Sequence, residues 1–417
     1  MRARKKRNRG WKQWEQPNKA NDGEVISIDW AALPQAVLEQ IFELLTPLDC
    51  VSVSNVCKSW RNVFSQEITS WNKRGFPSLF MSGQKDKKMR TCISMLEKRA
   101  WEMELPEAQG RYCWGSFHDW LILVNDIGRF SLEISLLNPF TKVKIDLPKT
   151  WNFYSKIVLS GDPALKNFVC MLVHGDCQEL AFWITGAQSW RKYKHDGKPY
   201  EDAIFCNGSF YLLSNDYHIC QIDVASIFTT IKKDDASVVC TDSDMKTQFL
   251  QVNMPENHSN DRVLRYLVES NGEVLLVCRF FNTNPDAMLE TLNFKVFVLD
   301  VSEMSWKRVE NLGDQILFLG KCCSRSFSSK ELGVHTCDCI YFSNDNITLW
   351  WNEWDAIPTK GMSSRFGLNN SGRKYWGVFR LNHKSNASFC FRGDQDNWAP
   401  IWFTVPLWWY CSNFMMN

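Results

Sequence analysis

The densest group of side chains that could hold a metal ion lies between residues 322 and 339. Cys322 and Cys323 are adjacent, and the segment HTCDCIYF carries His335, Cys337 and Cys339. Alternate residues of a strand point to the same side, so the last three would share one face of a strand. A structural zinc site, however, usually takes paired cysteines separated by roughly two to four residues. We therefore interpret these residues as small thiols in strands, and we predict no metal site and no cofactor.

A second candidate for chemistry is the adjacent pair His118 and Asp119, in which a carboxylate could orient an imidazole. The surrounding sequence GSFHDWL fits better a hairpin turn that leads into a strand. The seven histidines lie apart along the chain, and the sequence has no G-x-S-x-G, P-loop or G-x-G-x-x-G motif. We predict no catalytic residues and a protein that is not an enzyme.

The charge of the chain is unevenly distributed. Residues 1–10, MRARKKRNRG, contain six of the 48 basic residues and no acidic one, which leaves 42 basic and 46 acidic residues for the rest. Nucleic acid is therefore an unlikely partner for the body of the protein, whereas the tail has the composition of a nuclear import signal.

The location of the protein is predicted from what surrounds its cysteines. The 16 cysteines are scattered mostly singly among apolar neighbours, and the basic N-terminus lacks the apolar core of a signal peptide. The longest apolar run, 401–410, is too short to span a membrane and contains Pro406. We expect reduced thiols, no membrane association, and a location in the nucleus, the cytoplasm or both.

Changes in composition along the chain divide it into four segments. A polar N-terminus precedes a short helical stretch, and a charged connector separates that stretch from a long region rich in β-formers. We predict a disordered basic tail over 1–24, a helical module over 25–66, a linker over 67–104 and a β domain over 105–417. The connector includes RTCISMLEKRAWEMELP, which is compatible with a pair of strands or with a helix.

The helical module begins with Leu33 and Pro34, because proline is well tolerated in the first turn of a helix. Apolar residues then recur at spacings of three and four up to Leu45, which predicts an amphipathic helix. Thr46 can cap a second helix that opens with Pro47. A third helix or turn carries the apolar residues Cys57, Trp60, Val63 and Phe64.

From residue 105 onward, short runs of Val, Ile, Phe, Tyr and Trp alternate with turn residues. Asn-Gly, Asn-Asp and Gly-Asp pairs between the runs predict hairpins. A tryptophan follows a polar turn in SWRKY and again in SWKRV, at Trp190 and Trp306. Repeated units of four short strands with a recurring tryptophan are typical of propeller blades. The irregular period leaves a pair of β-sandwiches as an alternative.

The segment from Leu33 to Val63 resembles an F-box. The pattern L-P-x(2)-V-L-x(2)-I-F-x-L-L is followed by P-L-D-x-V-x-V-x(2)-V-C-x(2)-W-R, with normal spacing. Later segments, such as GSFHDWLILV, LLNPFTKVKIDLP and YLVESNGEVLLV, resemble the plant F-box proteins that carry a C-terminal KIB-type propeller-like domain. The Trp-rich sequence after about residue 350 departs from that family.

The resemblance implies a mainly β protein: a three-helix F-box followed by a β-propeller-like domain with Kelch-like blades. It also implies a substrate receptor of an SCF-type (Skp1–cullin–F-box) ubiquitin ligase, whose F-box binds a Skp1-like adaptor and through it cullin. The propeller would recruit a target protein for ubiquitination. By position, the adaptor contacts are Leu33, Pro34, Leu38, Ile41, Phe42, Leu45, Val53, Val56 and Trp60.

The stability expected of so short a module also favours an adaptor site. A module of about 40 residues cannot bury enough surface to be stable alone, and several exposed apolar side chains on it would mark a partner surface. The same face could instead pack on the β domain as ordinary core. Two other functions stay open: an interaction scaffold in the nucleus without ligase coupling, and a propeller enzyme.

The tryptophans near the end of the chain also allow two interpretations. We expect most of them in the core or in a closing strand, while some could form a target-binding surface, since tryptophan is frequent at interface hot spots. They are Trp350, Trp351, Trp354, Trp402, Trp408 and Trp409.

Overall fold

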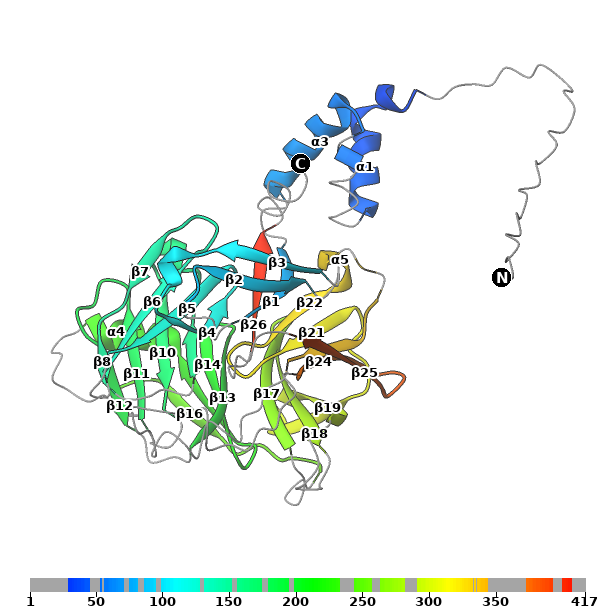
Figure 1. The fold of residues 1–417 in the computed structure, drawn as a ribbon. Coiled ribbons are helices and arrows are strands. Elements are labelled where there is room, and N and C mark those ends of the chain that lie inside the picture. The colour runs from blue at the N-terminus through cyan, green and yellow to red at the C-terminus, as the bar shows by residue number, and fades with distance from the viewer. Residues whose placement is uncertain are drawn as a thin grey trace, which may run out of the picture.

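The structure is a computed structural model, and its side chains and backbone are described for the greater part of the chain. The described ranges are 29–45, 53–54, 56–70, 75–81, 86–94, 99–127, 131–151, 156–174, 179–194, 199–232, 244–256, 263–281, 291–332, 334, 336–343, 373–392 and 400–406. Figure 1 shows a small helical module beside a ring of β-sheets. The predicted basic tail 1–24 and most of the predicted second helix lie outside the described residues.

The helical module consists of η1 (Trp30–Ala32), α1 (Gln35–Leu44) and α3 (Lys58–Ser70). Asp29 caps η1, because its Oδ1 accepts a hydrogen bond from the Ala31 amide at 3.0 Å. Pro34 is the N-cap of α1, so the predicted start of the first helix is confirmed. The predicted third helix is α3, which continues to Ser70, beyond the predicted end of the module at residue 66.

The described strands form six sheets, which are the blades of a propeller. Blade 1 contains β1 (Gly75–Phe80), β2 (Met89–Ser94), β3 (Arg99–Glu104) and β26 (Ile401–Pro406). Blade 2 contains β4 (Tyr112–Phe117), β5 (Trp120–Asp126), β6 (Ser131–Leu137), β7 (Lys144–Asp146) and β8 (Thr150–Trp151). Blade 3 contains β9 (Lys156–Leu159), β10 (Val169–Val173), β11 (Glu179–Ile184) and β12 (Arg191–Lys194).

Blades 4 to 6 continue the same order along the chain. Blade 4 contains β13 (Tyr200–Cys206), β14 (Ser209–Ser214), β15 (Ile219–Asp223) and β16 (Thr247–Leu250). Blade 5 contains β17 (Val263–Ser270), β18 (Glu273–Phe281), β19 (Thr291–Asp300) and β20 (Ser305–Val309). Blade 6 contains β21 (Gln315–Leu319), β22 (Arg325–Ser328), β23 (Cys339–Phe342), β24 (Arg373–Arg380) and β25 (Ser385–Arg392). Short helices lie between strands: η3 (Pro106–Ala108), η4 (Pro163–Leu165), α4 (Val224–Lys232) and α5 (Ser329–Leu332).

The ring closes through the two ends of the propeller. β26 pairs antiparallel with β1 from Gly75↔Pro406 to Phe80↔Ile401, so the last described strand completes the first blade. The strands β26, β4, β9, β13, β17 and β22 lie next to one another around the centre. Arg325 of β22 joins β26 through a 2.8 Å hydrogen bond from its Nη1 to Thr404 Oγ1. This radial arrangement leaves only short, protected sheet edges. The predicted β-propeller is confirmed, and the β-sandwich alternative is dropped.

The predicted linker over 67–104 is wrong for residues 75–80, 89–94 and 99–104, which form three strands of blade 1. RAWEME alternates in the manner of a half-buried strand, with Trp101 and Met103 buried between exposed Ala100, Glu102 and Glu104. Three strands of a blade need a fourth, and that strand comes from residues 401–406. Because the partner is about 300 residues away in sequence, the local pattern did not look like a complete blade.

The two Asn-Gly pairs form the predicted hairpin turns. Asn207 and Gly208 have φ angles of 45° and 80°, and Asn271 and Gly272 have φ angles of 51° and 80°. Positive φ at both central residues defines a type I′ turn, which matches the twist of the adjoining strands. The turns join Cys206↔Ser209 and Ser270↔Glu273.

The two recurring tryptophans each connect a blade to the one before it. Trp306 Nε1 in blade 5 donates to the Tyr217 carbonyl of blade 4 at 2.9 Å. Trp190, just before β12 of blade 3, donates at 2.7 Å to the carbonyl of Pro148, which lies between β7 and β8 of blade 2. A buried indole needs such an acceptor, so the weak sequence repeat corresponds to a repeated contact between blades.

The C-terminal part of the propeller departs from the regular blade. In blade 6, β21 and β23 run parallel, whereas the other strand pairs of the described sheets are antiparallel. Trp402 lies buried in the closing strand β26, as predicted for a closing-strand residue. The other five tryptophans of the predicted group lie outside the described residues.

Candidate functional site

The helical module has a hydrophobic core of its own. Five buried side chains form it, and Phe42 lies at its centre, with ring centroids 6.0 Å from Trp60 and 5.9 Å from Phe64. Partly buried apolar residues surround this core. The five buried residues are Leu38, Phe42, Trp60, Val63 and Phe64, and the surrounding ones are Leu33, Ile41, Leu45, Val53 and Cys57. All ten belong to residues 33–64, so this core is built without a described residue of the propeller.

A hydrogen bond between two tryptophans fixes the entry of the chain into α1. Trp60 Nε1, from α3, donates to the main-chain carbonyl of Trp30 at 2.9 Å. The bond holds η1 against α3, and η1 leads directly into Leu33 and Pro34. The indole of Trp30 itself remains 58% exposed.

The nine predicted adaptor contacts fall into three groups by exposure. Leu38, Phe42 and Trp60 are buried in the module's own core, so the structure corrects their role from surface contacts to the packing that shapes the surface. Two others, Pro34 and Val56, are exposed. The remaining four are half-buried at the edge of the core: Leu33, Ile41, Leu45 and Val53.

Two exposed apolar residues of the module were absent from the predicted contacts. Val37 is 40% exposed and follows Pro34 by three residues, on the helix stripe that continues to Ile41. The other is Trp30, which lies just before the sequence pattern used for the prediction. With Val56, which is 62% exposed, these residues give a very small module three large, water-exposed apolar side chains. Such a concentration is typical of a partner surface.

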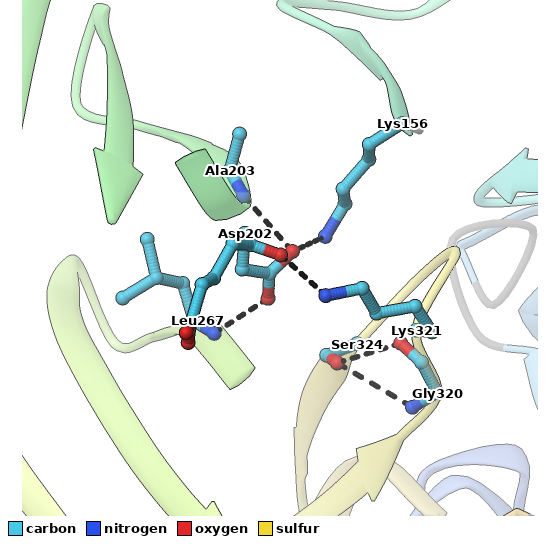
Figure 2. A network of polar contacts seen from close by, with 8 residues as sticks. Lys156, Asp202, Ala203, Leu267, Gly320, Lys321 and Ser324 are labelled. Carbon is cyan, nitrogen blue, oxygen red and sulfur yellow. Dashed lines mark hydrogen bonds and ion pairs between the residues drawn. The ribbon is translucent and has the colours of Figure 1, made fainter. Parts of the chain in front are cut away.

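The centre of the propeller is held by a buried ion pair. Lys156 Nζ of β9 donates to Asp202 Oδ1 of β13, and both side chains are almost fully buried (Figure 2). Asp202 also accepts hydrogen bonds from the amides of Ala203 at 2.9 Å and of Leu267 at 2.7 Å. The carboxylate therefore links the inner strands of blades 3, 4 and 5.

The loop of residues 320–324 lies against the same centre. Lys321 Nζ donates to the Glu201 carbonyl of blade 4, and Cys323 Sγ donates to the Trp402 carbonyl of blade 1 at 3.0 Å. Figure 2 shows Lys321 beside Asp202 and Lys156. In blade 2, a Cβ on Gly115 would lie only 3.6 Å from the Cys322 carbonyl, so the loop also approaches β4 closely. These contacts make the centre a packed polar junction between blades.

The pair His118 and Asp119 forms the β4–β5 turn, as the sequence predicted. His118 has a φ of 54°, and its Nδ1 receives a hydrogen bond from Arg325 Nη2 at 2.7 Å. Desolvation and the adjacent guanidinium lower the pKa of His118 to about 3. Asp119 instead accepts a 2.8 Å hydrogen bond from Asn138 Nδ2, and burial raises its pKa. The two side chains therefore have separate partners and form no acid–base pair.

The predicted cluster of cysteines is not assembled in the described structure. Cys322 and Cys323 lie at the centre of the propeller, whereas β23 begins at Cys339 and Cys337 lies before the strand. The expectation of one strand face for 335, 337 and 339 is therefore wrong, and His335 lies outside the described residues. Among the residues described, no group of three His, Cys, Asp or Glu side chains is placed to hold a metal ion. Burial raises the pKa of Cys323, which keeps its thiol protonated.

Comparison with known proteins matches both parts of the chain. The family model described as "KIB1-4 beta-propeller" matches residues 92–401, and the model described as "F-box-like" matches residues 30–76. No described helix combines the length and the apolar character that a membrane span requires.

Several curated relatives are F-box proteins of Arabidopsis thaliana. The F-box/kelch-repeat protein At1g57790 is 23% identical over 81% of this chain and 89% of its own length. F-box protein SKIP23 is 23% identical over 77% of this chain and 85% of its own length. Among solved structures, TolB from Acinetobacter baumannii matches 82% of this chain and 70% of its own, with 9% identity and a TM-score of 0.39. That score is too low to add to the argument.

Proposed function

Because the chain belongs to the KIB1-4 β-propeller family and carries an F-box-like module before its propeller, we propose that it is the substrate-recognition subunit of an SCF-type ubiquitin ligase. In this role the helical module binds a Skp1-like adaptor, and through the adaptor a cullin. The propeller holds a target protein. The chain itself contributes binding and no catalytic residue.

One observation carries the proposal. The core of the helical module is complete within residues 33–64, while Trp30, Pro34, Val37 and Val56 present apolar surface to water. Burying one such side chain contributes roughly 1.5–3 kcal/mol, so an adaptor that covers these side chains gains binding energy from them. Figure 1 shows α1 and α3 outside the ring of blades.

The mechanism is one of local concentration. A target held on the propeller lies within reach of a ubiquitin-charged enzyme that cullin brings to the same complex. Tethering of this kind raises the effective concentration of the target's lysines without any new chemistry on the receptor.

The test is purification of the full chain with a Skp1-like adaptor. The double variant Leu33→Ala/Pro34→Ala should lose the adaptor, because it removes the first apolar contacts at the start of α1. Leu165→Ala is the matched control: Leu165 is an apolar residue of the propeller that is 75% exposed. Retention of the adaptor by the double variant, or failure of the unmodified chain to bind it, would contradict the proposal.

A second function, an interaction scaffold of the nucleus without ligase coupling, is favoured by the basic tail alone. Six of the first ten residues are Lys or Arg. Nuclear partners recovered from the unmodified chain without adaptor or cullin would support this function. We propose a location in the nucleus, the cytoplasm or both, and neutralising the basic residues of 2–9 in a fluorescent fusion tests the nuclear part.

A further inference from the structure

Arg279 is a buried cation between blades 5 and 6. It lies on β18, next to β19 and close to the end of β23, and is only 4% exposed. Its Nε donates to Thr291 Oγ1 at 2.9 Å, and its Nη1 donates to the Ser343 carbonyl at 2.8 Å. These are its hydrogen bonds to the described residues, and no described carboxylate forms an ion pair with it. A guanidinium has five N–H donors, so three of them have no partner among the described residues.

Aromatic rings surround this guanidinium. Its central carbon lies 4.4 Å from the ring centre of Phe342, 4.9 Å from that of Phe281 and 5.9 Å from that of Phe294. The ring of Phe342 can occupy this place because residue 377 is glycine: a Cβ there would clash with that ring. The rings hold the cation by cation–π attraction, but they give the free N–H groups no oxygen to bind.

Two other arginines of the propeller combine an aromatic ring with a carboxylate. Arg265 lies 4.5 Å from the ring centre of Tyr217, and its Nη1 contacts both carboxylate oxygens of Glu201 at 2.9 and 3.0 Å. Arg308 lies 5.4 Å from the ring centre of Phe297, and its Nη1 contacts Glu256 at 3.0 Å. In both places a ring and a carboxylate hold the guanidinium together. Arg279 has the rings and is more deeply buried, yet none of the described carboxylates pairs with it.

A buried charge is normally paired. We propose that Arg279 anchors a carboxylate-binding subsite between blades 5 and 6, which takes an acidic side chain of the recruited protein. The proposal rests on the proposed function for the presence of a recruited protein, but the subsite itself can be tested without one. A planar carboxylate matches the fork of Nη1 and Nη2 with two parallel hydrogen bonds. A Glu side chain presents its carboxylate at the end of a flexible stem, whereas a chain terminus would have to bring its backbone with it.

The experiment uses the full chain purified with its adaptor, at constant ionic strength. The probes are sodium acetate, sodium phosphate and three small peptides: acetylated and amidated Gly-Glu-Gly, the same peptide with Gln, and the Gln peptide with a free C-terminal carboxylate. A ligand that binds the folded state raises the Tm in a saturable manner. Acetate and the Glu peptide should raise it, and the amidated Gln peptide should not.

Substitutions assign the effect to this arginine. Arg279→Met keeps the length and apolar contacts of the side chain, and it should abolish the rise in Tm. Arg279→Lys keeps the charge but lacks the planar fork, so it should weaken binding of the Glu peptide by about tenfold. This variant replaces Arg279→Met in the test if the Met variant does not fold. Arg380→Met removes an exposed arginine of β24 in blade 6 and should leave the rise intact.

Several results would overturn the subsite. They are the absence of a saturable rise, a rise that persists in Arg279→Met, a response to phosphate but not acetate, and a response to the free C-terminus but not to the Glu side chain. Adaptor co-purification is measured in the same samples. If the ligand tests fail while the adaptor still co-purifies, the subsite is contradicted and the proposed function is not. If the unmodified chain loses the adaptor, only the proposed function is contradicted.

Discussion

The side-chain amide of Asn207 donates a hydrogen bond to the main-chain carbonyl of Gly272 at 2.6 Å. Each residue lies in a type I′ turn, one in blade 4 and one in blade 5, so the bond joins the tips of two neighbouring hairpins. The approach is close: a Cβ on Gly272 would lie 3.4 Å from Asn207 Nδ2. The Asn-Gly pairs that shape each hairpin therefore also connect the blades.

Asn207→Gly should lower the stability of the propeller by about 1 kcal/mol, since glycine keeps the positive φ but removes the hydrogen bond. Asn207→Ala should cost about 1–2 kcal/mol more, because alanine is strained in the left-handed region. The measurement is the Tm of the purified chain. Equal Tm values for the glycine variant and the unmodified chain would show that this bond contributes nothing.

The buried ion pair at the centre of the propeller gives a second prediction. Lys156→Met leaves the Asp202 carboxylate in a buried site without its cation, which should cost about 3–5 kcal/mol. Asp202→Asn should be similarly costly, because an amide replaces one of the oxygens that accept from Ala203, Leu267 and Lys156. The single variants and the double variant are compared by thermal unfolding. A double variant more stable than Lys156→Met alone is expected, and strictly additive losses would argue against a coupled pair.

The parts of the fold that depend on near neighbours could be predicted from the sequence. The Asn-Gly turns, the start of α1 at Pro34 and the turn at His118 all follow from local backbone preferences. Blade 1 could not be predicted, because its fourth strand comes from residues 401–406, and a local pattern contains no information about so distant a partner.

The same limit applies to the candidate site. Periodicity identified the apolar stripe of α1, but it does not distinguish Phe42, which is buried against Trp60, from Val37, which faces water. That distinction depends on where α3 packs. Lys156, Asp202 and Arg279 were missed because each derives its role from strands of other blades. A lone charged residue inside an apolar strand, as in EVLLVCRFF, was the available signal for Arg279.

The bond between Trp60 and Trp30 predicts a link between module packing and adaptor affinity. Trp60→Phe removes the Nε1 donor and should destabilise the helical module by about 1 kcal/mol, so η1 is held less firmly beside Pro34. We expect weaker adaptor binding in a titration of the full chain. The matched control is Trp190→Phe, which removes the indole bond to Pro148 in the propeller. It should lower the Tm of the propeller and leave adaptor affinity unchanged.

The contact between His118 and Arg325 makes closure of the propeller sensitive to acid. His118 Nδ1 accepts from Arg325 Nη2, while Arg325 Nη1 and the His118 carbonyl both bind Thr404 of the closing strand. The folded-state pKa of His118 is lowered to about 3, below the value of about 6.5 expected when unfolded. The unfolded chain therefore takes up a proton first as the pH falls. The stabilising contribution is complete above about pH 6.5 and is lost progressively toward pH 3.

His118→Asn isolates this effect, because asparagine tolerates a positive φ, its Oδ1 can accept from Arg325, and it does not titrate. The difference in Tm between pH 7 and about pH 4.5 should be smaller in this variant than in the unmodified chain. His383→Asn, at an exposed position of the β24–β25 turn, controls for the loss of a histidine elsewhere and should keep the full difference. The imidazole of His118 is partly exposed. The quantity compared among the three proteins is therefore the slope of Tm against pH, and not the stability at neutral pH. Parallel slopes for all three proteins would mean that closure of the ring does not depend on a neutral His118.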